Sequence, residues 1–113
     1  MKVNTITYNP SKDIILTNIV NQIVDIAHPD KIILFGSRAM GKENKDSDYD
    51  ICVLKKDIKN DREIAKKIYR NLHGVGAGVD VIVKDAKRFE ELKDKWFMVY
   101  FDIAKYGKVI YAK

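Results

Sequence analysis

Two aspartates, Asp48 and Asp50, stand two positions apart at the start of an apolar run that has the composition of a buried strand. Residues two apart in a strand point to the same face, about 6.6–7 Å from each other. Carboxylate oxygens at that spacing can converge on a hard divalent cation such as Mg²⁺ or Mn²⁺, rather than zinc. Tyr49, Ile51 and Val53 supply the apolar opposite face that such a strand needs.

A third acid, Asp80, interrupts the apolar run of residues 79–83. An acid within an apolar strand is costly unless it is paired or bound to a metal. If this strand lies beside that of Asp50, Asp80 would complete a carboxylate triad, hold one metal and help to deprotonate an attacking hydroxyl. A salt-bridged core residue is the other interpretation of Asp80 taken alone.

Gly36 and Ser37 directly follow the apolar run of residues 31–35. The glycine permits a sharp turn and the close approach of a ligand. We expect Ser37 to cap a short helical turn over residues 37–40, whose N–H groups attract phosphate, and Arg38 to add a positive charge suited to phosphate oxygens. A phosphate-binding turn beside a metal-binding strand predicts phosphoryl or nucleotidyl transfer assisted by two metal ions.

The same residues resemble a known family. Gly36-Ser37, ten intervening residues and Asp48-Tyr49-Asp50 are similar to the GSx10DxD signature of the nucleotidyltransferase (DNA polymerase beta) superfamily. The stretch GSRAMG…SDYDICV and the ending IAKYGKVIY resemble the minimal nucleotidyltransferase (MNT) proteins of prokaryotes, over roughly residues 15–112. Met40 departs from the pattern, because many members have a second arginine there.

The resemblance implies an α/β fold, the nucleotidyltransferase palm, with a mixed sheet of three or four strands flanked by helices. It implies ATP as substrate, two Mg²⁺ ions, and Asp80 as the base. MNT proteins commonly act as antitoxins of HEPN ribonucleases and transfer AMP to a tyrosine of that toxin. The implied site residues are Gly36, Ser37 and Arg38 for the triphosphate and Asp48, Asp50 and Asp80 for the metals.

Two other functions stay open beside the adenylyltransferase antitoxin. The chain could be a catalytically weak module that neutralises a toxin by binding it, or a subunit of a small-molecule or RNA nucleotidyltransferase. The carboxylate set favours the first function, because occlusion alone needs no metal ligands. Since three elements use the residues after Asp50, little chain remains for an acceptor pocket, and we expect the acceptor to arrive on another molecule.

The spacing of apolar residues predicts strands alternating with helices. Residues 12–27 are expected to be helical, with Ser11 as the cap and Pro29 as the stop. Residues 86–106 are expected to be helical, either continuously or with a break midway, and Gly107 to end that helix. The other expected elements are a helix over 61–73 and strands over 31–35, 49–54, 79–83 and 108–112, the last at a sheet edge.

Aromatic residues gather in the C-terminal helical segment. Adjacent residues on a helix cannot face one direction, so one member of each adjacent aromatic pair should be exposed or at an interface. Phe97 and Phe101 are the candidates for that exposed role. The residues expected to face inward are Phe89, Leu92, Trp96, Phe97, Tyr100, Ile103 and Ala104.

Length and composition set the frame for these motifs. The 113 residues, 46% hydrophobic and 33% charged, predict one globular domain over residues 1–113. The net charge of +5 is compatible with a phosphate-bearing ligand or with a lysine-rich solvated surface. No apolar run could span a bilayer, no signal peptide is recognisable, and Cys52 is a single cysteine, so we expect a cytoplasmic protein without a membrane or direct nucleic-acid partner.

Overall fold

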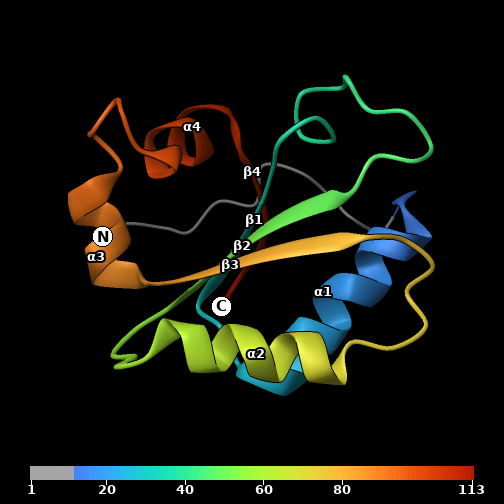
Figure 1. The fold of residues 1–113 in the computed structure, drawn as a ribbon, viewed down its shortest axis with the longest axis horizontal. Coiled ribbons are helices and arrows are strands. Elements are labelled where there is room, and N and C mark those ends of the chain that lie inside the picture. Colours follow the sequence, from blue (N-terminus) through green and yellow to red (C-terminus); the bar gives the residue numbers. More distant parts are fainter. Residues whose placement is uncertain (1–11) are drawn as a thin grey trace.

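The computed structural model describes residues 12–113. Four strands form one sheet in the order β3–β2–β1–β4 (Figure 1). The central strand β1 is antiparallel to both neighbours, whereas β2 and β3 are parallel, and the sheet is therefore mixed, as predicted. The strands are β1 (Lys31–Phe35), β2 (Tyr49–Lys55), β3 (Val79–Asp85) and β4 (Lys108–Ala112), with β4 at an edge as expected.

Helices cover both faces of the sheet (Figure 1). Two of them, α1 (Ile14–Ala27) and α2 (Asp61–Asn71), lie on one face, and α3 (Ala86–Leu92) and α4 (Val99–Tyr106) lie on the other. The apolar stripe of α1 is buried, with Leu16, Ile19 and Ile23 fully covered, because its 3.6-residue spacing directs these side chains to the sheet. Within residues 12–113, no helix is long and apolar enough to cross a membrane.

The two faces of β2 belong to different cores. Ile51 and Val53 pack in the larger core with α1 and α2, and Cys52 and Leu54 pack in the smaller core under α3 and α4. Burial raises the pKa of the Cys52 thiol to about 12, which makes it an inert residue of the core. Asp50 precedes Cys52 by two residues and so begins the face that α3 and α4 cover.

The first helix begins later than expected. Ser11, the predicted cap, lies outside the described residues, and Asp13 is the N-cap of α1. One carboxylate oxygen of Asp13 accepts a hydrogen bond from the backbone N–H of Leu16 at 3.0 Å, which satisfies a free helix-end donor. The other oxygen accepts from the Tyr49 hydroxyl at 2.8 Å, so the start of α1 is tied to the start of β2.

The segment after β1 forms turns rather than the predicted short helix. The backbone N–H of Ala39 bonds to the carbonyl of Gly36 at 3.1 Å, and that of Met40 bonds to the carbonyl of Ser37 at 3.1 Å. Gly41 then takes a φ of 70°, which leaves the right-handed region and ends the turns. Ser37 therefore caps no helix, and that prediction was wrong.

The C-terminal helical segment is broken into α3 and α4, which is the second of the two forms expected for residues 86–106. Residues 93–98 form turns between α3 and α4, and the helical phase does not continue across them. Trp96 and Phe97 are consequently 77% and 69% exposed. Phe97 was expected both among the inward-facing residues and as an exposed member of its pair, and only its exposure is confirmed; the inward orientation predicted for Trp96, Phe97 and Ala104 was wrong. Phe101 is partly buried.

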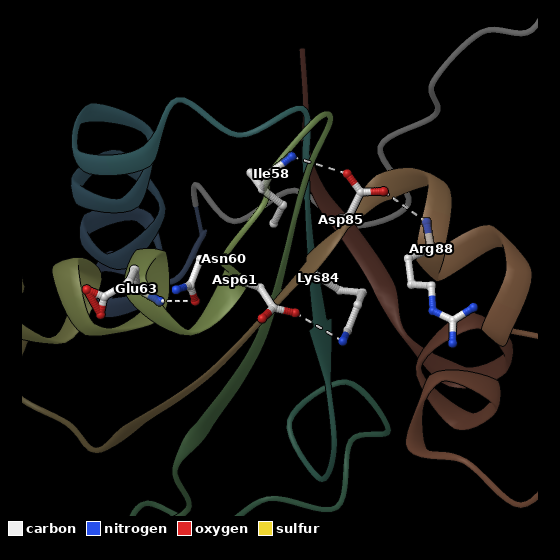
Figure 2. A network of polar contacts seen from close by, with 7 residues as sticks. All are labelled: Ile58, Asn60, Asp61, Glu63, Lys84, Asp85 and Arg88. Atoms are coloured by element: carbon white, nitrogen blue, oxygen red, sulfur yellow. Dashed lines mark hydrogen bonds and ion pairs between the residues drawn. The ribbon is translucent and has the colours of Figure 1, made fainter.

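Polar contacts join α2, β3 and α3 at the carboxyl end of β3 (Figure 2). Asp85 caps α3 by accepting a hydrogen bond from the backbone N–H of Arg88 at 3.1 Å, and this bond is the main reason that its pKa is lowered. Its other oxygen accepts from the N–H of Ile58 at 3.3 Å. Lys84 pairs with Asp61 of α2 at 3.1 Å. The carboxyl end of β3 is therefore tied both to α2 and to α3.

Candidate active site

The parallel pairing of β2 and β3 brings Asp50 and Asp80 together. They are register partners, and in-register residues of neighbouring strands point to the same face. Asp50 is half-buried and Asp80 is exposed. Burial raises the pKa of Asp50 above its ordinary 3.8, and the negative charges of Asp80 and then Asp48 raise it further, because each repels a second carboxylate.

Asp48 is placed by the segment that enters β3. The backbone N–H of Tyr49 donates to the carbonyl of Gly78 at 2.9 Å, which extends the β2–β3 pairing by one step. Gly78 lies so close to the Asp48 carboxylate that a β-carbon at position 78 would overlap it. The exposed Asp48 side chain therefore lies over the backbone that leads to Asp80.

The turn after β1 meets the same carboxylates. Phe35 pairs with Asp50 across the antiparallel β1–β2 ladder, and the next residue, Gly36, has a φ of 73°. A β-carbon at Gly36 would overlap the Asp50 carboxylate, so this position requires glycine for both conformation and space. The backbone N–H groups of Ser37 and Arg38 and the Ser37 hydroxyl have no hydrogen-bond partner within residues 12–113.

Arg38 supports the loop that carries Asp48. Its Nε donates to the carbonyl of Ser47 at 3.0 Å, and its Nη2 lies 3.4 Å from the carbonyl of Asn44. The guanidinium carbon lies 4.0 Å from the centre of the Tyr49 ring, in cation–π contact. Arg38 was predicted as a phosphate ligand, and much of its hydrogen-bonding capacity serves the residues around Asp48 instead.

The sequence that contains these residues matches the model of a known protein family. The model of the polymerase beta nucleotidyltransferase domain matches residues 17–113 of the chain. The chain belongs to this nucleotidyltransferase family. No curated protein is detectably similar in sequence.

Solved structures share the fold of this nucleotidyltransferase domain. A candidate nucleotidyltransferase from Sulfolobus solfataricus has 26% sequence identity and a TM-score of 0.62, over 88% of this chain and 78% of that one. A toxin–antitoxin complex with AMP-PNP contains a chain with 23% identity and a TM-score of 0.58, over 86% of this chain and 73% of that one. A mutant of the MntA–HpeT toxin–antitoxin contains a chain with 21% identity and a TM-score of 0.50, over 94% and 75%.

The donor chemistry at this nucleotidyltransferase site suits a hard cation. Within residues 12–113, none of Asp48, Asp50 and Asp80 forms an ion pair with a lysine or arginine, so their charges are not balanced by those residues. In the same part of the chain, no three His, Cys, Asp or Glu side chains are gathered closely enough to hold a metal ion as they stand. Burial and then the charges of Asp80 and Asp48 raise the pKa of Asp50, and a divalent cation bound here would relieve the repulsion between the carboxylates.

Two residues that contribute to the site escaped the sequence analysis. Gly78 stands directly before the third strand, and this position is the signal that could have marked a close approach to an acid. Asp13, the N-cap of α1, also accepts the hydrogen bond of Tyr49, between the two metal-site candidates. No spacing rule links Asp13 to Tyr49, because the contact depends on how α1 packs on the sheet.

Proposed function

We propose that the chain is a Mg²⁺-dependent nucleotidyltransferase that transfers AMP from ATP to a tyrosine of a HEPN ribonuclease toxin and so acts as its antitoxin. The observation that carries the enzymatic part is the register pair Asp50–Asp80, which lies on one sheet face directly beside Gly36. Family membership supports the nucleotidyl chemistry. The resemblance of the GSRAMG…SDYDICV stretch to MNT proteins supports the antitoxin part.

The triphosphate would lie against the turn after β1. Gly36 has no side chain to block its approach, and the N–H groups of Ser37 and Arg38 can donate to phosphate oxygens. Arg38 keeps one terminal nitrogen, Nη1, without a hydrogen-bond partner among residues 12–113. That nitrogen can contact a phosphate oxygen while the rest of the guanidinium holds the loop.

The three carboxylates would hold the metal ions and receive the proton. Asp48, Asp50 and Asp80 are the residues that would bind Mg²⁺, which supplies neutralisation of the phosphate charge when bound. The tyrosine oxygen of the toxin forms a bond to the α-phosphorus, the bond from that phosphorus to the bridging oxygen breaks, and pyrophosphate leaves. The Asp80 carboxylate would take the tyrosine proton, and its exposure on the edge strand β3, which an incoming protein can reach, supports this role.

An acceptor on another protein fits the size of the domain. The residues from Asp50 to Ala112 form the rest of β2, the helices α2, α3 and α4 and the strands β3 and β4, which pack together in this one domain. Two proteins of similar fold are known from toxin–antitoxin complexes, one of them with a nucleotide analogue. These complexes guide the choice of a toxin as acceptor.

The test uses the purified chain, a candidate HEPN toxin, ATP and Mg²⁺. We expect mass spectrometry to show that the toxin gains the mass of one or more AMP units on a tyrosine and loses its ribonuclease activity. The matched variant is the isosteric Asp48→Asn/Asp50→Asn double substitution, which should remain folded and leave the toxin unmodified.

The alternatives are separate outcomes of this experiment. If the double variant still silences the toxin, neutralisation occurs by binding, and the enzymatic antitoxin is refuted. If labelled ATP marks a polynucleotide or an antibiotic but no protein, the chain is a different nucleotidyltransferase and the proposed acceptor is wrong.

A further inference from the structure

An apolar cavity opens beside the turn that follows β1. It has a volume of about 410 Å³, within the range of small-ligand sites. Gly36, whose backbone lies against the Asp50 carboxylate, is part of its wall, so the cavity is continuous with the candidate active site. The other lining residues are Phe35 of β1, Met40 of the turn, and Val99, Asp102 and Tyr106 of α4.

The lining of this cavity suits a heterocyclic base better than a phosphate. Met40, Val99 and Tyr106 are each more than 40% exposed, although apolar surface of this size is usually covered in a folded protein. No lysine or arginine lines the cavity, and its one charged group is the Asp102 carboxylate, which would repel phosphate. An aromatic ring, a thioether and one hydrogen-bond acceptor are what a planar base with an amino group requires.

The order of the strands assigns this cavity to the nucleotide and not to the acceptor. Asp80 lies on the edge strand β3, Asp50 on β2 and Gly36 after β1, so the three follow one another across the sheet. The cavity continues beyond Gly36 under α4, on the far side from Asp80. An acceptor that gives its proton to Asp80 would enter from the β3 side, which leaves the α4 side for the rest of the nucleotide.

We infer that the cavity between Gly36 and α4 binds the base of the nucleotide, and that Asp102 selects bases that present an exocyclic amino group. Asp102 accepts a hydrogen bond from that amino group, and the Tyr106 ring and Met40 cover the base. ATP is therefore preferred over UTP, which has a carbonyl oxygen at the corresponding position. This inference rests on the proposed function, because it requires phosphates at Gly36 and Ser37.

The position of Asp102 has a second possible explanation, which the test must separate. Asp102 stands in the first turn of α4, where an acid favours the helix dipole. That effect would stabilise α4 whichever nucleotide is bound. It does not account for the exposed apolar side chains that surround the carboxylate.

Calorimetry on the full chain with Mg²⁺ can isolate the contribution of the base by comparing ATP, UTP and inorganic tripolyphosphate. We expect the wild type to bind ATP about tenfold or more tightly than UTP or tripolyphosphate. Asp102→Asn, which has the shape of aspartate, should reduce the preference for ATP over UTP by about tenfold, which lies within the range of discrimination that a good base contact provides. Tyr106→Ala should weaken the binding of ATP by about tenfold and leave the affinity for tripolyphosphate unchanged.

Two exposed residues outside the cavity provide matched controls. Asp94→Asn removes an acid and Trp96→Ala removes an aromatic ring from the segment between α3 and α4, and neither should alter ATP binding. Equal affinity for ATP and tripolyphosphate, or equal effects of the cavity and control variants, would overturn the base site while leaving the proposed function intact. If neither ATP nor tripolyphosphate binds with Mg²⁺, the proposed function fails and the base site fails with it.

Discussion

Asp50 is held in a position that is unfavourable for its own charge. Burial is the largest cause of its raised pKa, followed by repulsion from Asp80 and Asp48. A carboxylate with a raised pKa takes up a proton more readily in the folded chain than in the unfolded chain. Its contribution to stability is complete below the unfolded pKa of about 4 and is lost as the pH rises through the folded value.

Neutralising Asp50 should therefore stabilise the protein in the absence of metal. Without Mg²⁺, we expect Asp50→Asn to raise the Tm at pH 7 by a few degrees, the size of effect that relief from a functional strain commonly gives in a domain this small. The difference should shrink as the pH is lowered from 7 to 4, because the raised pKa of Asp50 lets the folded wild type take up this proton more readily than the unfolded chain. Thermal unfolding followed by circular dichroism at both pH values measures this difference.

Mg²⁺ should reverse the order of the two proteins. Added Mg²⁺ is expected to raise the Tm of the wild type, because the ion binds the folded site, and to have little effect on Asp50→Asn. Asp46→Asn is the control, because it removes an exposed acid from the loop that precedes β2, and it should behave as the wild type. A variant that is less stable than the wild type at pH 7 would show that the Asp50 carboxylate is not under electrostatic strain.

The site shows which residue-level features a sequence can reveal. Strand periodicity predicted that Asp80 could join Asp48 and Asp50 on the condition that the two strands are neighbours, and the parallel β2–β3 pairing meets that condition for Asp50 and Asp80. The contacts of Gly78 with Asp48 and of Arg38 with Ser47 depend on the path of loops, for which no periodicity exists.

At the scale of elements, the loop between β1 and β2 has no regular structure and relies on a single side chain. The Arg38 guanidinium contacts the carbonyls of Asn44 and Ser47 and covers the Tyr49 ring. It therefore holds the residues on both sides of Asp48 in place. A lysine carries the same charge but lacks the planar fork that makes several directed contacts. The Arg38→Lys substitution therefore separates a structural role from a purely electrostatic one.

If Arg38 positions Asp48, Arg38→Lys should weaken Mg²⁺ binding more than nucleotide binding. We expect the apparent affinity for Mg²⁺, titrated calorimetrically at saturating ATP, to fall about tenfold, as is usual for loss of a residue that orients a metal ligand. Lys42→Ala, in the same loop, removes an exposed charge and should leave that affinity unchanged. A loss confined to ATP affinity would instead identify Arg38 as a phosphate ligand alone.

At the scale of the whole molecule, the sheet was predictable and the last third of the chain was less so. Strand positions followed from short apolar runs bounded by glycine, proline and polar residues, because such runs are typical of buried strands. The break between α3 and α4 lies in a stretch whose aromatic residues continue the helical spacing of apolar residues. Composition cannot distinguish an aromatic residue in the core from one left exposed for a partner, and Trp96 was misplaced for that reason.

The exposed aromatic pair at this break is a candidate contact surface for the proposed toxin partner. Trp96 and Phe97 contact each other edge to face, with ring centres 5.7 Å apart, in the segment that joins α3 to α4. These helices cover the face of the sheet that Asp50 and Asp80 share. A protein bound to the pair would thus approach the site from the face on which its tyrosine must react.

Replacing both aromatics should uncouple toxin binding from nucleotide binding. We expect Trp96→Ser/Phe97→Ser to weaken association with the toxin by tenfold or more, because exposed aromatics are the usual anchors of protein interfaces, and to leave the affinity for Mg²⁺ and ATP unchanged. Surface plasmon resonance with immobilised toxin measures the association. Ile14→Ser, which removes an 84% exposed apolar side chain on the opposite face, is the matched control. Equal affinity of the double variant and the wild type would show that the toxin does not bind through this aromatic pair.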